Sequence, residues 1–150
     1  MKKPIRIELR PAPISPPPGA VDPSCGAVCT FRGVTRAETH PEFGVLEALE
    51  YEVHEAMARS QLERLAEAIL EEFAIEALVV VHAVGRVPVG EPSVHVEVTA
   101  GHRDAAFGAC RAMIDRLKER VPIFKVECWA GGRTRPEGVQ PSPDPTSRED

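Results

Sequence analysis

Residues 54–73 read HEAMARSQLERLAEAILEEF, and their pattern decides how the rest of the chain is interpreted. Apolar side chains recur every three or four positions, while charged side chains fall largely on the other side, as in an amphipathic helix that covers a core. This is the clearest helix that the sequence predicts. Its apolar positions are Ala58, Leu62, Leu65, Ile69 and Phe73.

Strands are predicted on both sides of this helix. Residues 45–53 place Val45, Leu49, Tyr51 and Val53 in a strand that leads into it. Residues 77–84 form a short, apolar and β-branched run that suits a central strand. After a turn over 87–92, apolar residues alternate over 94–98, so two adjacent strands are expected here.

A second helix is predicted from about Asp104 to Arg120, and Pro122 ends it. Residues 123–128 then form a last strand. From Val45 onward the order is strand, helix, strand, strand, helix, strand, which by itself indicates a ferredoxin-like two-layer sandwich. The apolar stripe of the second helix consists of Phe107, Cys110, Met113, Ile114 and Leu117.

Two earlier strands, over 5–9 and 26–31, have no place in a ferredoxin-like unit. The proline-rich stretch 11–18 predicts an extended, wrapped loop, and 33–44 predicts a polar loop that carries Arg36. Residues 1–135 are expected to form a single α+β domain. The proline-rich tail 136–150 cannot bury enough apolar surface to order itself, so it is predicted to be disordered.

The formal net charge of −5 argues against broad electrostatic binding to nucleic acid or to an anionic membrane. No stretch approaches the roughly 20 apolar residues that span a bilayer. The four cysteines are irregularly spaced and predict buried or spare thiols rather than a zinc or redox motif. The five histidines show no metal-binding spacing, so neither a metal nor another cofactor is expected. A reduced, cytoplasmic protein is the simplest interpretation.

The region 102–125 has a positive net charge, opposite in sign to the net charge of the chain. It contains six Lys or Arg against three Asp or Glu. His102 and Arg103 stand at a predicted helix start, where free backbone N–H groups and the helix dipole can bind a phosphate or carboxylate. Alternatively, Arg103 pairs with Asp104 or faces solvent. Arg36 is either an anion clamp on a mobile loop or a solvated arginine.

Lys118 borders the apolar stripe of its helix, so its ammonium group either reaches water or overhangs a pocket. Lys125 follows the break at Pro122 and shares a strand face with Glu127, with which it can form an ion pair. Tyr51, Glu52 and His82 are interpreted as core and hydrogen-bonding residues rather than catalysts. The sequence lacks a serine-nucleophile turn and the glycine-rich nucleotide-binding motifs.

Six blocks between Gly26 and Glu127 together resemble the large subunit of molybdopterin synthase. The closing part of the match, from Gly101 to Glu127, is the most specific. The chain departs from the family pattern at Ala83, where Arg is usual, at Phe124, where Trp is common, and at Val126, where a basic residue is frequent. The six blocks are Gly26-Ala27-Val28 with Phe31-x-Gly33-x-x-Arg36, Leu49-Glu50-Tyr51-Glu52 with Met57-Ala58, His82-x-Val84-Gly85, Val89-Gly90-Glu91, Gly101-His102-Arg103 with Ala106-Phe107, and Asp115-x-Leu117-Lys118-x-x-Val121-Pro122-Ile123-Phe124-Lys125-x-Glu127.

The resemblance implies an α/β hammerhead, two-layer α+β fold with an additional antiparallel β subdomain, in place of the ferredoxin-like sandwich. It also implies a homodimer that forms the core of a heterotetramer with two copies of a small ubiquitin-like sulfur-carrier subunit ending in Gly-Gly. By the same resemblance, the C-terminal thiocarboxylate of that subunit gives its sulfur to the pterin substrate, cyclic pyranopterin monophosphate. Two such transfers form the dithiolene of molybdopterin.

The resemblance further implies that Lys118 lies nearest the thiocarboxylate and that Lys125 assists in substrate binding and catalysis. Arg36, His102 and Arg103 are the implied contacts of the phosphate and pterin, some of them supplied across the dimer. A rival interpretation is a pterin-binding or scaffold module that has kept the fold and lost turnover.

Overall fold

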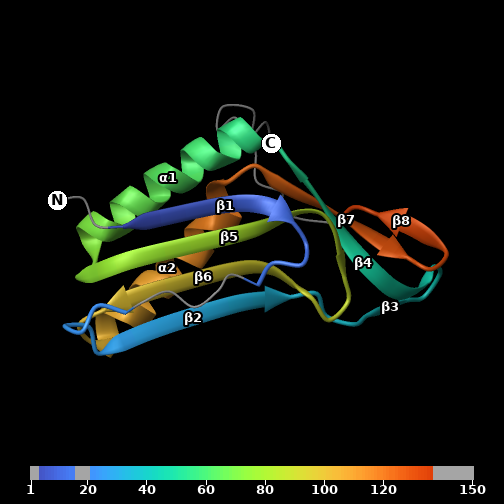
Figure 1. Ribbon diagram of the computed structural model, residues 1–150. Coiled ribbons are helices and arrows are strands. Elements are labelled where there is room, and N and C mark those ends of the chain that lie inside the picture. The colour runs from blue at the N-terminus through green and yellow to red at the C-terminus, as the bar shows by residue number, and fades with distance from the viewer. Residues whose placement is uncertain (1–3, 16–20, 137–150) are drawn as a thin grey trace.

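The computed structural model describes residues 4–15 and 21–136 and shows two helices covering one face of an eight-stranded sheet (Figure 1). The α+β class and the extra strands implied by the family resemblance are thereby confirmed. The elements are β1 (Ile5–Pro11), β2 (Ala27–Val34), β3 (Thr39–His40), β4 (Gly44–Val53), α1 (Glu55–Glu72), β5 (Ile75–Pro88), β6 (Pro92–Ala100), α2 (Arg103–Arg120), β7 (Ile123–Trp129) and β8 (Gly132–Thr134).

The sheet runs in the order β2-β6-β5-β4-β7-β8, with β1 paired to β5 and β3 paired to β4. All pairs are antiparallel except β1 with β5. Along one edge of β5, β1 pairs with residues 78–84 and β4 then pairs with residues 85–88. Gly85 stands at this change of partner with a φ of 82°, which a residue with a side chain rarely adopts.

The ferredoxin-like arrangement expected from the element order is wrong. In that split unit, the two strands joined by the first helix run parallel, with another strand between them. Here the strands joined by α1 are β4 and β5, which are direct antiparallel neighbours. The element order alone could not distinguish the two arrangements because both place two helices on one face.

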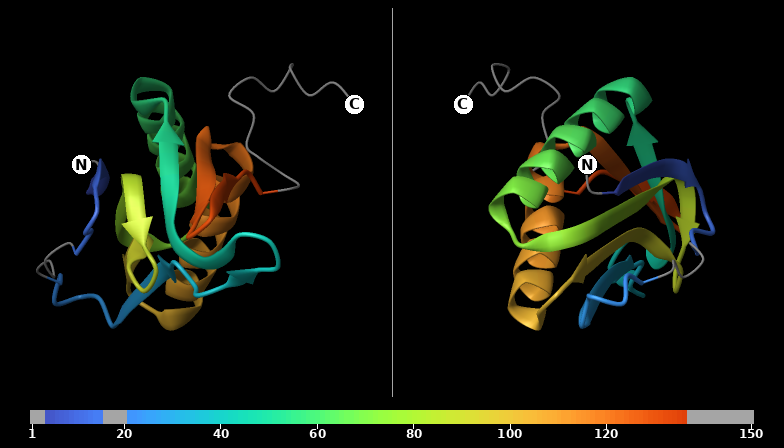
Figure 2. Two further views of the ribbon diagram at one scale, coloured as in Figure 1. Left: turned by 90° about the vertical axis from the view of Figure 1, so that its right-hand side faces the viewer. Right: turned by 60° about the vertical axis from the view of Figure 1, so that its left-hand side comes forward.

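The helices lie side by side, with α1 over β1 and β5 and α2 over β2 and β6 (Figure 2). Four of the apolar positions predicted for the first helix are buried, whereas Phe73 follows the helix as its C-cap. In the second helix, Phe107 is the exception, because 62% of it is exposed. The large core cluster lies between these helices and the sheet.

The opposite face of the sheet carries a small second cluster. Ile14, fully buried, packs there with Val81, Ala83 and Val87. This confirms that the first part of the proline-rich stretch wraps onto the sheet. Residues 16–18 of that stretch, and residues 137–150 of the predicted tail, lie outside the described residues. The division into one domain over 1–135 and a tail over 136–150 stays a prediction.

The loop predicted over 33–44 is shorter than expected, because Gly33 and Val34 extend β2 and Thr39–His40 forms β3. A further strand, β8, was not predicted. Its Thr134 hydroxyl accepts a hydrogen bond from the Trp129 indole at 2.8 Å and donates one to Glu127 at 2.9 Å. These bonds and the β7–β8 ladder hold the hairpin that ends the sheet.

Candidate active site

The end of α2 and the start of β7 bring Lys118 and Lys125 to one cavity. The backbone N–H of Val121 closes α2 by bonding to the Leu117 carbonyl, and Pro122 cannot continue the helix. The chain therefore turns into β7 within the few residues that separate the two lysines. The cavity has a volume of about 360 Å³ and is lined by Gly33, Val34, Leu49, Tyr51, His82, Ser93, Val94, Ile114, Leu117, Lys118, Val121, Ile123 and Lys125.

Neither cavity lysine forms an ion pair or a side-chain hydrogen bond with any residue that the structure describes. The ion pair of Lys125 with Glu127 considered from the sequence is absent there, since the Glu127 carboxylate accepts from Thr134 instead. The chain has four lysines, Lys2, Lys3, Lys118 and Lys125, so every described lysine lines this cavity. Two cations are thus available to an anionic ligand.

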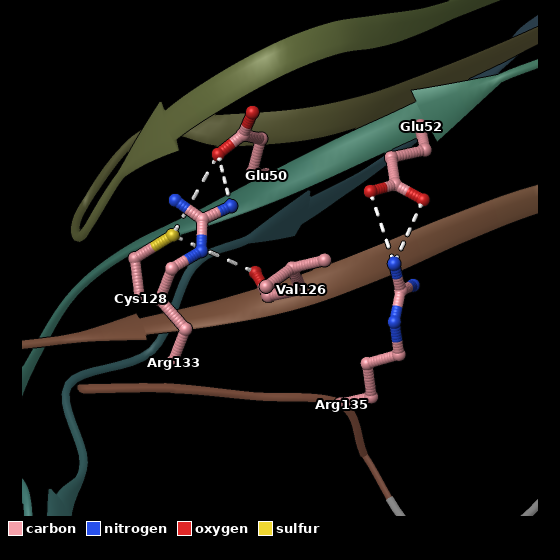
Figure 3. A network of polar contacts seen from close by, with 6 residues as sticks. All are labelled: Glu50, Glu52, Val126, Cys128, Arg133 and Arg135. Carbon is pink, nitrogen blue, oxygen red and sulfur yellow. Dashed lines mark hydrogen bonds and ion pairs between the residues drawn. The ribbon is translucent and has the colours of Figure 1, made fainter.

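Arginines nearby are engaged differently. Figure 3 shows Arg133 directed at Glu50 and Arg135 directed at Glu52, and none of these four residues lines the cavity. The shortest N–O distances are 2.8 Å for Arg133 with Glu50 and 3.2 Å for Arg135 with Glu52. These positive charges are neutralised within the chain.

The uncharged polar residues of the cavity wall come from neighbouring strands. Tyr51 on β4 is in register with Lys125 on β7, and its ring meets the His82 ring edge-on at a centroid distance of 5.0 Å. Burial raises the pKa of the Tyr51 phenol above its usual 10.0, although a hydrogen bond with Ser93 opposes the shift. Tyr51 therefore stays protonated at neutral pH.

His82 is 5% exposed and hydrogen-bonds through Nδ1 to the carbonyl oxygen of Ala83 at 2.7 Å. Burial lowers the pKa of His82 from 6.5 to about 4; the bond to Ala83 opposes this shift, and the positive charge of Lys118 adds to it. The imidazole is therefore neutral at pH 7. The sequence interpretation of Tyr51 and His82 as core and hydrogen-bonding residues missed that both face a cavity, and a histidine within an apolar strand was the available signal.

The three other predicted site residues do not reach this cavity within one chain. Arg36 lies beyond β2, with 84% of its side chain exposed, and pairs with Glu38 at 2.9 Å. His102 and Arg103 are exposed at the opposite end of α2 from Lys118. Fifteen residues separate Arg103 from Lys118, which is about 22 Å along a helix. Neither His102 nor Arg103 has an ion-pair partner among the described residues.

A second hollow of about 590 Å³ adjoins the first, because Lys118 and Ile114 line both. Its other lining residues include Phe31 and the exposed Phe107, which accounts for the position of Phe107 outside the core. Cys29 and Cys110 also line it. Burial, followed by a hydrogen bond with Cys29, raises the pKa of the Cys110 thiol to about 12, so this thiol is a poor nucleophile.

Residues 4–15 and 21–136 contain no group of three or more His, Cys, Asp or Glu side chains that could hold a metal ion. All four cysteines are free thiols. Neither α1 nor α2 has the length and apolar character of a membrane-crossing helix. The polar side chains that line the cavity offer two ammonium groups, a phenol, a hydroxyl and a neutral imidazole.

Comparison with known families identifies the chain. The sequence profile of the family described as MoaE protein matches residues 10–120. The chain belongs to the MoaE protein family. A curated member from Dictyostelium discoideum, named molybdopterin synthase catalytic subunit, is 39% identical over 113 residues, which cover 74% of this chain and 70% of that relative.

Solved structures of the family share the fold. Molybdopterin synthase from Staphylococcus aureus aligns with a TM-score of 0.72 and 29% identity, covering 92% of this chain and 99% of that one. A complex of subunits 1 and 2 of molybdopterin-converting factor from Helicobacter pylori aligns with a TM-score of 0.67 and 18% identity, covering 91% and 92%. At the latter identity, the likeness concerns the fold alone.

The three departures from the family pattern lie outside the cavity. Ala83 points to the opposite face of β5 from His82, where it is buried in the cluster of Ile14. Phe124 and Val126 alternate with the cavity-lining Ile123 and Lys125 along β7. The departures therefore leave the lining of this cavity unchanged.

Proposed function

We propose that this chain is the catalytic subunit of a molybdopterin synthase. It transfers sulfur from the C-terminal thiocarboxylate of a small ubiquitin-like subunit to cyclic pyranopterin monophosphate, which builds the dithiolene of molybdopterin. The observation that carries the proposal is the pair of cavity lysines, Lys118 and Lys125, without carboxylate partners in an acidic chain. The names of the related proteins support the reaction.

The chemistry requires two anionic reactants to meet, since both the thiocarboxylate and the phosphorylated pterin carry negative charge. Two fixed cations in a partly enclosed cavity offset this repulsion and stabilise charge that develops during transfer. We assign Lys118 to the thiocarboxylate, where its ammonium polarises the carbonyl or assists proton transfer. Lys125 takes part in substrate binding and catalysis from the facing strand.

Arg36, His102 and Arg103 are proposed contacts of the phosphate and pterin. Within one chain, His102 and Arg103 lie about 22 Å along α2 from Lys118, too far to share one small substrate with it. In the proposed homodimer, which forms the core of a heterotetramer, a second protomer supplies them to the cavity of the first. Their exposure and the lack of an ion pair at His102 and Arg103 support this assignment.

We place the reaction in the cytoplasm, and the four free thiols support a reducing compartment. No resident cofactor enters the proposed reaction.

Reconstitution tests the proposed function. The purified chain is mixed with the thiocarboxylated small subunit and cyclic pyranopterin monophosphate, and molybdopterin is measured as its fluorescent oxidation product. Product that accumulates with both components and not with the carboxylate form of the small subunit is the expected result. If the chain binds the pterin or the partner but forms no product, the proposed sulfur transfer is overturned and a pterin-binding or scaffold module is favoured.

Mixing inactive variants tests the shared site. Lys118→Ala and Arg103→Ala homodimers are unfolded together and refolded, so that half of the dimers are expected to be mixed. If the site is built across the dimer, one of the two cavities in a mixed dimer keeps both residues and activity returns. The matched control mixes Lys118→Ala with Lys125→Ala, which should stay inactive because both residues come from one chain. Inactivity in the first mixture would contradict the shared site.

A further inference from the structure

His82 has a ring nitrogen whose role the proposed function leaves open. Because the Ala83 carbonyl oxygen can only accept, Nδ1 must carry the proton of their 2.7 Å hydrogen bond. In a neutral imidazole the other nitrogen, Nε2, then holds a bare lone pair and acts as an acceptor. Nε2 has no hydrogen-bond partner among the described residues. It does not belong to the described side-chain atoms that lack a partner and are also closed off from solvent.

The surroundings hold His82 in this state. The edge-on contact with Tyr51, at an interplanar angle of 78°, and the bond to Ala83 fix the plane of the imidazole. The charged groups that line the same cavity, Lys118 from α2 and Lys125 from β7, both disfavour a third positive charge. His82 thus offers one oriented acceptor in a wall whose charged groups, the two ammonium ions, can only donate.

We propose that His82 is a ligand-binding residue of this cavity, whose Nε2 accepts a hydrogen bond from an N–H or O–H donor of the molecule that the two lysines attract. A structural role needs only the Nδ1 contact with Ala83. A buried acceptor facing a cavity is unfavourable when left unpaired, so a ligand that brings a donor gains affinity over one that does not. The lysines select the anionic part of the ligand, and His82 selects its donor.

The identity of the ligand rests on the proposed function, which offers two sources of this donor. One is a backbone amide N–H in the Gly-Gly tail of the small subunit, and the other is a ring N–H or hydroxyl of the pterin. Both sources accompany an anionic group, as the cavity requires. The experiment distinguishes them by adding each separately.

Two variants separate the ring nitrogens of His82. His82→Asn keeps an amide N–H near Nδ1, which can still bond to Ala83, and loses the acceptor at Nε2. His82→Gln extends the amide and returns an acceptor oxygen toward the cavity. The Kd of the carboxylate form of the small subunit and that of cyclic pyranopterin monophosphate are measured for each variant by calorimetry. We expect His82→Asn to weaken one of the two by about tenfold, the loss of one hydrogen bond, and His82→Gln to restore much of it.

Nitrogen-15 NMR of the wild-type imidazole makes the test independent of whether either variant folds. On addition of the small subunit or the pterin, the Nε2 resonance should move toward the hydrogen-bonded range while Nδ1 stays in place. An unchanged Nε2 resonance with both saturating ligands would overturn the assignment, as would wild-type affinities for both in a folded His82→Asn variant. Because these readouts measure binding, a chain that binds but forms no molybdopterin would refute the proposed turnover and leave the role of His82 intact.

Discussion

On one face of strands β4 and β7 a lysine is left without an ion pair, whereas on the other face two glutamates each pair with an arginine. On one face, Lys125 stands in register with Tyr51, lines the cavity and forms no ion pair with a described residue. On the other, Glu50 and Glu52 are each neutralised by an arginine from the segment at or just after β8 (Figure 3). Strand alternation separates the two sets by one residue.

This difference teaches where the chain keeps charge available for a ligand. Surface ion pairs between exposed groups contribute little to stability and leave no net charge for a partner. Cations without a partner are costly to gather in one place, so their presence at a cavity points to an anion that binds there. The predictions below change one face at a time.

Loss of the unpaired cation at Lys125 should have a larger effect than each of the three changes that follow. In Lys125→Ala, the rate of molybdopterin formation is expected to fall by about 10²-fold or more, as when one charge-stabilising donor is removed from an active site. The unfolding midpoint in urea should stay near that of the wild type, because Lys125 has no ion-pair partner among the described residues. A large loss of stability together with the loss of rate would contradict the separation of the two faces.

Low pH should lower the free energy of unfolding through His82, which lines the cavity. The pKa of His82 is about 4 in the folded chain against 6.5 when exposed, so between these values the unfolded state binds more protons. The contribution of His82 is therefore full above pH 6.5 and is lost as pH falls toward 4, by about 3 kcal/mol in all. Urea unfolding at pH 7 and pH 4 should show a larger loss for the wild type than for His82→Gln, and equal losses would contradict a buried neutral imidazole.

A smaller effect is expected where the N-terminal segment covers the outer face of the sheet. Ile14 is fully buried against Val81, Ala83 and Val87. Ile14→Val should lower the free energy of unfolding by about 1 kcal/mol, the usual consequence of removing one buried methylene group. Its molybdopterin synthesis should equal that of the wild type at temperatures well below unfolding. Reduced synthesis by a fully folded variant would show that packing on the outer face affects the reaction in the cavity.

The smallest effect is expected from the arginines of the outer face. Arg133→Ala removes a positive charge from β8, the neighbour of the strand that carries Lys125, but this charge already pairs with Glu50. Its rate of molybdopterin formation should match the wild type, and its melting temperature should change little. A drop in rate comparable to that of Lys125→Ala would mean that net positive charge, rather than the cavity position, governs the reaction.

Local sequence patterns predicted the elements well, whereas their arrangement was predicted wrongly by the element order and correctly only by the family resemblance. Helical spacing located Ala58, Leu62, Leu65 and Ile69 in the core because burial on one face imposes that period. Local sequence patterns could not reveal that β5 changes partner at Gly85, since pairing between distant strands leaves no such pattern. Phe107 fitted the apolar stripe and proved exposed, because periodicity cannot tell a core position from one that borders a hollow.

The candidate site was predictable only in part. The family resemblance, rather than the residue spacing, assigned Lys118 and Lys125 to one site, and the structure puts both on one cavity. The positions of His102 and Arg103 followed correctly from their helix start, yet their distance from Lys118 makes a second protomer necessary if all four residues share one substrate. Assembly of this kind is not encoded in local sequence patterns. The proposed role of His82 rests on a hydrogen bond to the next residue of its own strand, which no local sequence pattern reveals.

The most direct test of the central claim is the rate of molybdopterin formation by Lys118→Ala, measured with saturating thiocarboxylated small subunit and cyclic pyranopterin monophosphate. Circular dichroism and the unfolding midpoint establish that the variant is folded, as expected for a side chain without an ion-pair partner among the described residues. The account predicts that product is abolished while the fold survives. Undiminished product from the folded variant would contradict the assignment of sulfur transfer to the cavity lysines.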